Sequence, residues 1–336
     1  MLSGRSRLLL IPGLAVLLIA AVMLGLSMGT IRLDWSTIGH DDTAATALLQ
    51  LRLPRVLLAV LIGAVLAQTG AVAQALFRNP LAEPGLIGVS AGAALAAAVV
   101  HTALTGIGGL STLPPSLLLP IAAFGGGLTA ATLVLRLARR DGHTDMTTML
   151  LAGTAINAFV AAIVGLLSAR ADDSGLRGFT LWMYGNLGRA GWSEIAIAAP
   201  VLLAVALWLP REARGLDALL LGDTEAQHLG VDVERLKRRA LIAVVLATGA
   251  AVSLAGVIGF VGLVVPHAIR LLAGPGHRLL LPASALLGAV LLTLADTVAR
   301  TAAAPAEWPV GALTSALGAP FFLALLLRMR KRIGLP

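Results

Sequence analysis

The stretch that decides the fold runs from Arg52 to Ala98 and reads RLPRVLLAVLIGAVLAQTGAVAQALFRNPLAEPGLIGVSAGAALAAA. Its first apolar segment, Val56–Phe77, contains no charged residue. As a helix these roughly 22 residues would be about 33 Å long, which is enough to cross the hydrocarbon core of a bilayer. Arg52 and Arg55 stand immediately before this segment. We therefore predict a membrane-spanning helix whose entrance is fixed by two positive charges.

A polar turn with two prolines separates this segment from a second apolar one. Pro80 and Pro84 have no N–H and disfavour helical dihedral angles at the residues before them. We expect the first helix to end near Arg78 and the second to begin at Leu86. The stretch is thus predicted to be a helix, an elbow and a second helix.

The composition extends this interpretation to the whole chain. Of the 336 residues, 58% are hydrophobic and 12% are charged, which is far too apolar for a soluble domain. The net charge of +8 does not indicate nucleic-acid binding, because the basic residues lie in short clusters between apolar segments. There is no cysteine, so disulfides, thiolate metal sites and lipid attachment to cysteine are excluded. The predicted fold class is an all-α polytopic membrane protein with a single transmembrane domain over residues 1–336.

Uncharged apolar runs predict about ten transmembrane helices. The first follows Arg5 and Arg7 and resembles a signal peptide, but its apolar run is longer than usual, so we expect a retained helix. The segment at 261–272 is short and interrupted by proline. The predicted spans are 8–29, 54–77, 86–102, 116–137, 147–168, 192–208, 239–257, 261–272, 279–298 and 310–327.

The distribution of Lys and Arg predicts the orientation. With the N-terminus inside, 18 of the 25 basic residues fall in inner segments. Such an excess is typical of cytoplasmic loops, so both termini are predicted to be cytoplasmic in a bacterial inner membrane. The remaining seven, on the outer side, are Arg32, Arg52, Arg55, Arg170, Arg177, Arg189 and Arg300.

Two connections are longer than a turn requires. The outer one, residues 169–191, carries Trp182 and Tyr184 with Trp192 just beyond, and we expect a short helix lying at the membrane surface. The inner one, residues 210–238, is the most polar part of the chain and is predicted to form two short helices, with Asp223 as N-cap of the second.

Catalytic and metal-binding patterns are weak. Residues 88–92 read G-V-S-A-G, but a nucleophile elbow needs a preceding strand, so helix packing explains the pattern better. The histidines have no metal-ligand spacing, and we expect His267 to be a packing histidine at membrane depth. Neither lysine follows a glycine, so the chain has no P-loop for ATP. Acidic groups within the spans are nearly absent, which disfavours an ion-coupled carrier and favours energy supply by a separate subunit.

Four motifs together resemble a known family. They are R-L-P-R with FRNPLAEPGLIGVSAGA, GVIGFVGLVVPHAIRLLAGPGHRLLLPAS, ADTVAR, and WPVGALTSALGAPFFLALL. The chain resembles the permease subunits of the ABC importers for iron-siderophore, haem and cobalamin, the FecCD type. This resemblance implies a type II importer fold and a homodimer with two cytoplasmic ATPase copies and one periplasmic binding protein. It also implies that this chain binds no cofactor, since ATP and Mg²⁺ would be bound by the partner ATPase.

The resemblance assigns roles to three groups of residues. The outer arginines would pair with glutamates of the binding protein as exposed ion pairs, and the elbow with the start of the fifth span would line a cytoplasmic gate. Part of the inner loop would seat in the ATPase. The implied residues are Arg52, Arg55 and Arg300 for docking, Asn79, Leu81 and Thr147 (or Thr148) for the gate, and Leu221, Gly222, Asp223, Glu225, Ala226, Leu229 and Gly230 for coupling.

The substrate is less clearly implied. The run GLIGVSAGAALAA at 85–97 and the segment ADDSGLR at 171–177 look most like the haem-importing branch. A ferric siderophore is the close alternative, cobalamin a further one, and a stand-alone secondary transporter a distant one. Simple anchoring at the membrane interface is the alternative role for the outer arginines.

Overall fold

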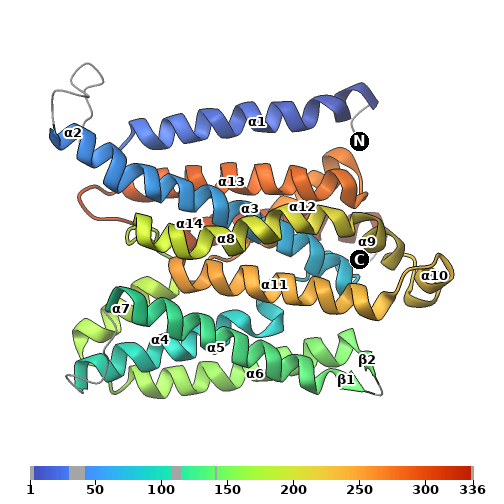
Figure 1. Cartoon of the computed structure of the whole chain (residues 1–336), viewed down its shortest axis with the longest axis horizontal. Helices are drawn as coiled ribbons and strands as arrows, with labels where there is room; N and C mark the ends of the chain where they lie inside the picture. The colour runs from blue at the N-terminus through green and yellow to red at the C-terminus, as the bar shows by residue number, and fades with distance from the viewer. Residues whose placement is uncertain (1–3, 30–41, 107–114, 141, 334–336) are drawn as a thin grey trace.

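The computed structural model describes residues 4–29, 42–106, 115–140 and 142–333. Each of the ten predicted spans is a helix, and most of them lie roughly antiparallel to one another in one bundle (Figure 1). The helices are α1 (Gly4–Ser27), α3 (Leu53–Leu76), α4 (Val89–Gly106), α5 (Pro115–Leu137), α6 (Met146–Ser168), α8 (Trp192–Trp208), α11 (Val233–Ala255), α12 (Val261–Ala273), α13 (His277–Thr301) and α14 (Val310–Ile333).

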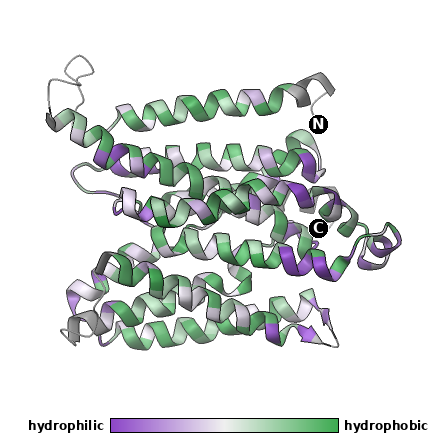
Figure 2. Cartoon of the chain, viewed as in Figure 1, coloured by the Kyte–Doolittle hydropathy of each residue, from purple (hydrophilic) through white to green (hydrophobic). Residues whose placement is uncertain are grey.

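Seven helical segments are long and apolar enough to cross a membrane, and three shorter apolar helices accompany them. The shorter ones are Val89–Thr102, Val261–Ala273 and Val310–Ala324. Apolar residues run along the bundle, whereas hydrophilic residues gather toward its ends (Figure 2). The all-α membrane fold predicted from the sequence is therefore confirmed.

Helix α3 forms the centre of the bundle, and most of its side chains are buried by α8, α11, α12 and α13. Glycines allow this close packing: a Cβ on Gly63 would collide with the backbone of Gly288 in α13, and a Cβ on Gly70 with the backbone of Gly262 in α12. Small residues at such crossings let helix backbones approach in lipid, where van der Waals packing drives association. The packing of α3 thus depends on particular glycines rather than on hydrophobicity alone.

The elbow after α3 is present, but α4 begins three residues later than predicted. Arg78 has a left-handed backbone with φ 46°, which ends the helix. A 3-10 turn, η2 (Pro84–Ile87), follows and ends at Gly88 with φ 86°. Because this left-handed residue interrupts the helical path, α4 starts at Val89 instead of Leu86.

The chain is also broken between α11 and α12. Gly256 (φ 72°) and Phe260 (φ 67°) have left-handed φ angles on either side of a short stretch without regular secondary structure. The Asn186 N–H donates to the Ala255 carbonyl at 2.7 Å, and Gly311 lies so close to the Val257 carbonyl that a Cβ there would be 2.7 Å from its oxygen. The break is therefore packed against two other connections of the chain.

At one end of the bundle, called here the α7 end (left in Figure 1), α2 (Asp42–Thr46) and a π-helical turn η1 (Ala47–Arg52) lead directly into α3. Arg52 and Arg55 are consequently inside a helix rather than at its entrance. The connection 169–191 contains α7 (Asp173–Met183). Tyr184 and Trp192 are exposed, whereas Trp182 is buried beside Phe179. The short helix predicted for this connection is present, and its position at the membrane surface stays a prediction.

At the opposite end, called the α10 end, the polar connection contains η3 (Leu209–Glu212), α9 (Ala213–Leu219) and α10 (Asp223–His228). Helix α11 begins at Val233, earlier than the predicted 239, because Asp232 caps it by accepting the Arg235 N–H at 3.0 Å. The N-cap of α10 is Gly222 and not Asp223. Two-residue strands, β1 (Arg139–Arg140) and β2 (His143–Thr144), pair antiparallel between α5 and α6.

Candidate functional site

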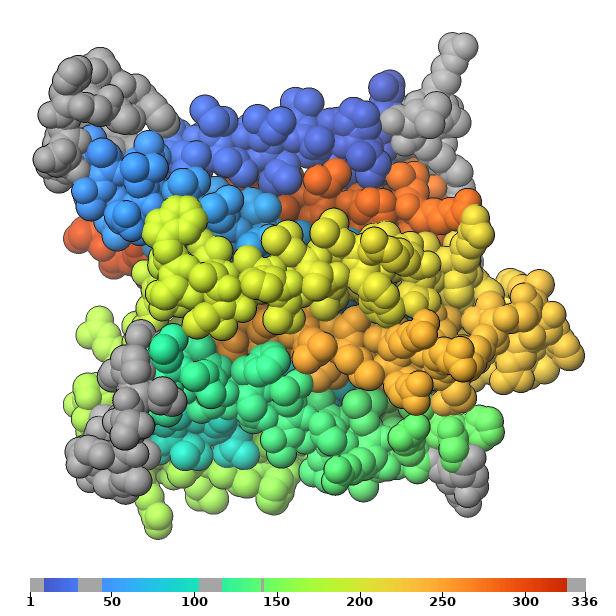
Figure 3. All heavy atoms as spheres, in the orientation of Figure 1, coloured from blue at the N-terminus to red at the C-terminus, as the bar shows by residue number. Residues whose placement is uncertain are grey.

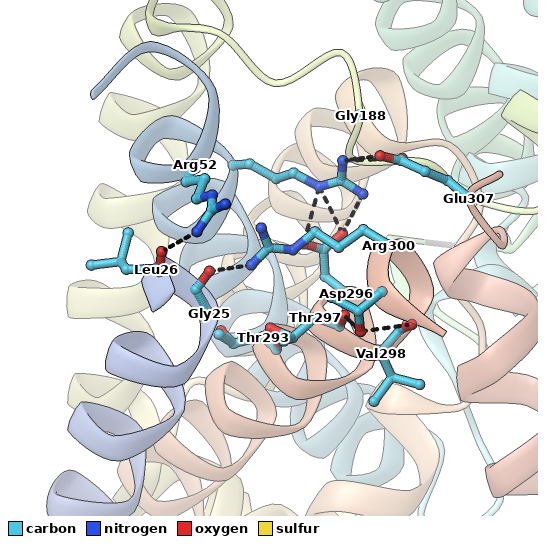
Figure 4. Close-up of polar contacts among 12 residues, drawn as sticks. Gly25, Leu26, Arg52, Gly188, Thr293, Asp296, Thr297, Val298, Arg300 and Glu307 are labelled. Atoms are coloured by element: carbon cyan, nitrogen blue, oxygen red, sulfur yellow. Dashed lines mark hydrogen bonds and ion pairs between the residues drawn. The ribbon is translucent and has the colours of Figure 1, made fainter. Parts of the chain in front are cut away.

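A cluster of charged residues lies at the α7 end where α1, α3 and α13 meet (Figure 4). The Arg55 guanidinium binds Asp296 of α13, with Nη2 at 2.9 Å from one carboxylate oxygen, and Nη1 lies 3.0 Å from Glu307. Arg300 lies one helical turn beyond Asp296, with Nε 3.6 Å from its other oxygen. A single buried carboxylate therefore faces two guanidinium groups.

Two of these arginines also hold the end of α1. Arg52 donates through Nη1 to the carbonyls of Leu26 and Ser27, both at 2.8 Å, and Arg300 donates to the carbonyl of Gly25. The last carbonyls of a helix have no partner within the helix and carry the negative end of its dipole. Both arginines therefore satisfy acceptors that α1 itself leaves open.

The expected exposure of the docking arginines is wrong in this chain. Arg52, Arg55 and Arg300 are only 5%, 9% and 5% exposed, because Asp296 and Glu307 and the end of α1 cover them. A cavity of about 200 Å³ nevertheless reaches all three from the loops carrying Gly188 and Glu307. The docking role itself stays a prediction.

Asp296 and Glu307 were missed by the sequence analysis. The signal for Asp296 was present, because Asp296 and Arg300 are four residues apart and so lie on one helix face. Glu307 lies in the connection between α13 and α14 and has no such pattern. Only the fold brings it to Arg55.

At the α10 end, the connection of residues 209–232, called here the polar segment, projects beyond the helical bundle (Figures 1 and 2). Two large apolar side chains on it face outward: Leu221 is 65% and Leu229 64% exposed. Gly222 (φ 131°) and Gly230 (φ 83°) form the turns at either end of α10. This surface combines exposed leucines with charged residues at the end of the chain that the charge pattern predicts to be cytoplasmic.

The predicted coupling residues lie on this segment, but they do not all face outward. Ala226 is completely buried and packs α10 against the rest of the chain. Asp223 turns back toward the bundle, where its carboxylate accepts from Lys237 Nζ at 2.6 Å and pairs with Arg78. Leu221, Leu229 and Glu225 remain as the side chains available to a partner.

Lys237 connects three elements at this end. Its side chain is 4% exposed, and its ammonium lies 2.6 Å from Asp223, 3.7 Å from Glu234 and 3.4 Å from the Thr144 carbonyl. Glu234 in turn accepts the N–H and hydroxyl of Thr144, both at 3.1 Å. Ion pairs therefore join the polar segment to α11 and, through Arg78, to the elbow, and hydrogen bonds of Thr144 join α11 to the β1–β2 hairpin.

The predicted gate residues occupy two separate places. The Asn79 side chain accepts the Leu81 N–H at 2.9 Å within the elbow. Thr147 is exposed at the start of α6, where Asp145 accepts its N–H at 3.2 Å and that of Thr148 at 3.1 Å. Among the described residues no hydrogen bond joins Thr147 to the elbow. The elbow contacts α6 further along, since Asn157 donates to the Gly85 carbonyl at 3.3 Å.

Asp145 is the N-cap of α6 and lies outside the membrane-spanning segments. Hydrogen bonds from the Thr148 hydroxyl and from the N–H groups of Thr148 and Thr147 lower the pKa of its carboxyl. The carboxylate form is favoured because these donors, and the positive end of the helix dipole, stabilise negative charge. The start of α6 is thus held by an ionised cap.

The remaining candidates do not form a site for chemistry. His267 packs edge-on against Phe321 with ring centroids 6.4 Å apart, and neither ring nitrogen has a hydrogen-bond partner among the described residues. Gly92 of the G-V-S-A-G pattern packs against Gly126 of α5. No group of three or more potential metal ligands occurs in the ranges that the structure describes.

Comparison with known proteins gives consistent matches along the chain. The model of the FecCD transport family matches residues 17–328. The hemin transport system permease HmuU of Yersinia pestis is 46% identical over 98% of this chain and 99% of its own length. The cobalamin import permease BtuC of Halobacterium salinarum is 43% identical over 86% of this chain and 75% of its own length.

Similar structures agree with this result. A solved structure, described as an inward-facing conformation of a metal-chelate type ABC transporter, superposes with a TM-score of 0.84 at 30% identity. The match covers 95% of this chain and 98% of the other. Both the sequence and the arrangement of helices are therefore shared over nearly the whole length.

Proposed function

Because the chain belongs to the FecCD transport family, whose members are permease subunits of ABC transporters and not enzymes, we propose that it is the permease of an ATP-driven haem importer. In this proposal a homodimer of the chain takes haem from a periplasmic binding protein and releases it into the cytoplasm. ATP is hydrolysed on a separate subunit. The observation that carries the substrate is the 46% identity with a hemin permease over 98% of the chain.

The polar segment supports the assignment of an ATPase-binding surface. Leu221 and Leu229 expose apolar area at the predicted cytoplasmic end, on a segment too polar to lie in lipid. Exposed apolar side chains with a polar rim are typical of protein interaction sites. We assign Leu221, Gly222, Glu225, Leu229 and Gly230 to this surface, with Asp223 and Ala226 fixing α10 to the bundle.

The arginine cluster supports docking of a binding protein at the predicted periplasmic end. Arg55 and Arg300 share the carboxylate of Asp296, and a cavity opens beside their guanidinium groups. A glutamate of a binding protein that enters this cavity would pair with these guanidinium groups. Such a contact would set the orientation and rate of docking more than the affinity.

Lys237 and Arg78 support a route from the ATPase to the gate. Movement of α10 would move Asp223, and Asp223 is paired with both residues. Arg78 directly precedes Asn79 and lies three residues before Leu81, and we assign both of these residues to the gate. Nucleotide would then bias a two-state equilibrium between inward-open and outward-open arrangements, because its binding favours one position of α10. Alternating access follows from that bias.

The experiment is ATP hydrolysis by the complex reconstituted in lipid. The chain and its ATPase are mixed with binding protein that is empty, haem-loaded, cobalamin-loaded or loaded with a ferric siderophore. Stimulation by the haem-loaded protein alone is the expected result. Stimulation by the cobalamin-loaded protein alone would instead favour the alternative that similarity to cobalamin permeases supports.

Each interaction surface has its own variants. Leu221→Asp with Leu229→Asp should abolish co-purification of the ATPase, whereas Leu176→Asp, an exposed leucine of α7, should not. Glu307→Gln frees Arg55 from one partner and should strengthen binding of the binding protein. If Glu307→Gln weakens that binding, the arginines do not receive a carboxylate from the partner.

A further inference from the structure

A second positively charged site lies at the α10 end between α5 and α11. It is a cavity of about 480 Å³ beside the β1–β2 hairpin, on the side of the bundle where α5 and α11 are neighbours (Figure 3). The residues that carry its chemistry are four arginines: Arg136 from the end of α5, Arg139 from β1, and Arg235 and Arg238 from the start of α11.

These charges are only partly compensated. Asp232 pairs with Arg235 at 3.1 Å, and Glu234 is already engaged by Lys237 and Thr144. In the part of the chain that the structure describes, Arg136, Arg139 and Arg238 have no ion pair. The cavity is therefore lined by three exposed arginines with no carboxylate partner in the described ranges, and their combined positive charge would attract an anion.

The floor of the cavity is apolar. Leu135 of α5 and Leu241 and Ile242 of α11 line it on the side toward the middle of the bundle. Leu135 directly precedes Arg136 in α5, and Leu241 and Ile242 follow Arg238 by three and four residues in α11. A site with this order, cations outside and apolar side chains inside, matches the boundary between lipid headgroups and acyl chains.

An apolar groove lies next to the cavity, on the α8 side of α11. Its volume is about 390 Å³, it is lined by Trp208 and Val205 of α8 and by Ala243 and Leu246 of α11, and it shares Ile242 with the cavity. The groove has almost no polar lining apart from Arg239, which pairs with Glu212 at 3.9 Å. An extended hydrocarbon chain could follow this groove toward the middle of the bilayer.

We propose that the cavity binds one anionic phospholipid of the adjacent leaflet, with its phosphate held by Arg136, Arg139 and Arg238 and an acyl chain in the α8–α11 groove. Guanidinium groups bind phosphate through paired N–H donors, and basic pockets between transmembrane helices are suited to anionic headgroups. The leaflet is cytoplasmic if the orientation proposed above holds. The lipid would lie beside Thr144 and Glu234, and so beside the ion pairs of Lys237.

The test measures lipid binding by the full chain in detergent, without the ATPase. Native mass spectrometry titrations compare phosphatidylglycerol, phosphatidylcholine and inorganic phosphate. We expect one phosphatidylglycerol to bind per chain in preference to phosphatidylcholine. Arg136→Gln with Arg238→Gln should weaken the binding of phosphatidylglycerol roughly thirtyfold, because each arginine lost near an anionic lipid headgroup reduces the affinity about fivefold. Arg214→Gln with Arg278→Gln, which removes two exposed charges elsewhere at the same end, is the matched control.

A second measurement on the unmodified chain separates the possible occupants. Dihexanoyl phosphatidylglycerol has the same headgroup but chains too short for the groove, so it should bind clearly more weakly than the dioleoyl lipid. Equal binding of inorganic phosphate and lipid would make the ligand a free anion and overturn the proposal. Equal loss of phosphatidylglycerol binding in both double variants would overturn the proposal as well. Release of the bound lipid when the ATPase is added would also overturn it and would identify the cavity as an ATPase contact.

Discussion

The buried ion cluster at the α7 end allows a quantitative test of what holds α1, α3 and α13 together. The perturbation is Asp296→Asn, which preserves the size of the side chain and removes its charge. Asp296 is 1% exposed and bonds Arg55 through both carboxylate oxygens at 3.0 Å. Without it, the partners left among the described residues are Glu307 for Arg55 and the Gly25 carbonyl of α1 for Arg300.

The expected magnitude follows from burial. Removing one partner of a buried ion pair leaves a charge without compensation and costs about 3–5 kcal/mol. Glu307→Gln is the matched control, because it also removes a carboxylate from Arg55. Its side chain is 37% exposed and Asp296 remains in place, so the expected cost is only about 0.2–1 kcal/mol after allowing for solvent screening.

The assay is equilibrium unfolding in mixed micelles with increasing mole fraction of SDS, followed by the fluorescence of the tryptophans. Asp296→Asn should lower the free energy of unfolding several times more than Glu307→Gln does. The double variant Asp296→Asn with Arg55→Met should recover part of the loss, because one of the two uncompensated charges is then gone. Similar effects of the two single variants would mean that water reaches the cluster, and would refute the buried-pair explanation.

Three further predictions concern other parts of the chain. Lys237→Met should leave the ATP hydrolysis rate of the complex within about twofold, while substrate uptake into proteoliposomes falls because α10 loses its link to α11. The control Lys237→Arg should retain uptake. Equal loss of ATP hydrolysis and uptake in Lys237→Met would count against a transmitting role. Gly70→Val should prevent the chain from folding into a monodisperse species, because the valine side chain would collide with the backbone of Gly262. The control Gly125→Ala faces open space and should change stability by less than about 1 kcal/mol. Size-exclusion chromatography and SDS unfolding measure both variants. Because the pKa of Asp145 is lowered in the folded chain, its carboxylate stabilises the fold above the unfolded-state pKa of about 3.9, and this contribution is lost as pH falls through the lower folded-state pKa. Asp145→Asn should therefore reduce the loss of stability at acid pH. An unchanged dependence of stability on acid pH would contradict the role of Asp145 as an ionised cap.

The sequence predicted the helices better than it predicted their polar contacts. Hydrophobic runs identify spans because lipid leaves few alternatives to a helix. The predicted helix boundaries were wrong where one residue decides them. At Gly88 a left-handed backbone delays the start of α4, and at Asp232 a side-chain cap extends α11 into charged sequence.

The arginines illustrate the same limit at the candidate site. Arg55 and Asp296 are 241 residues apart, so no local pattern indicates that they meet. A charge expected to face water is instead paired inside the bundle. Conversely, the exposure of Leu221 and Leu229 could not be foreseen, because it depends on how far the polar segment projects.

The break between α11 and α12 has a consequence for how the chain is made. Helix α12 has 13 residues. At about 1.5 Å per residue it is roughly 20 Å long, too short to cross a hydrocarbon core of about 30 Å. The non-helical residues 256–259 before it would leave backbone groups unpaired in lipid. The connections that pack against this break come from an earlier part of the chain, at Asn186, and from a later part, at Gly311. We therefore expect stable insertion of α12 to wait until synthesis has passed Gly311, so a nascent chain ending after α12 should be released from the translocation machinery in a protease-sensitive state.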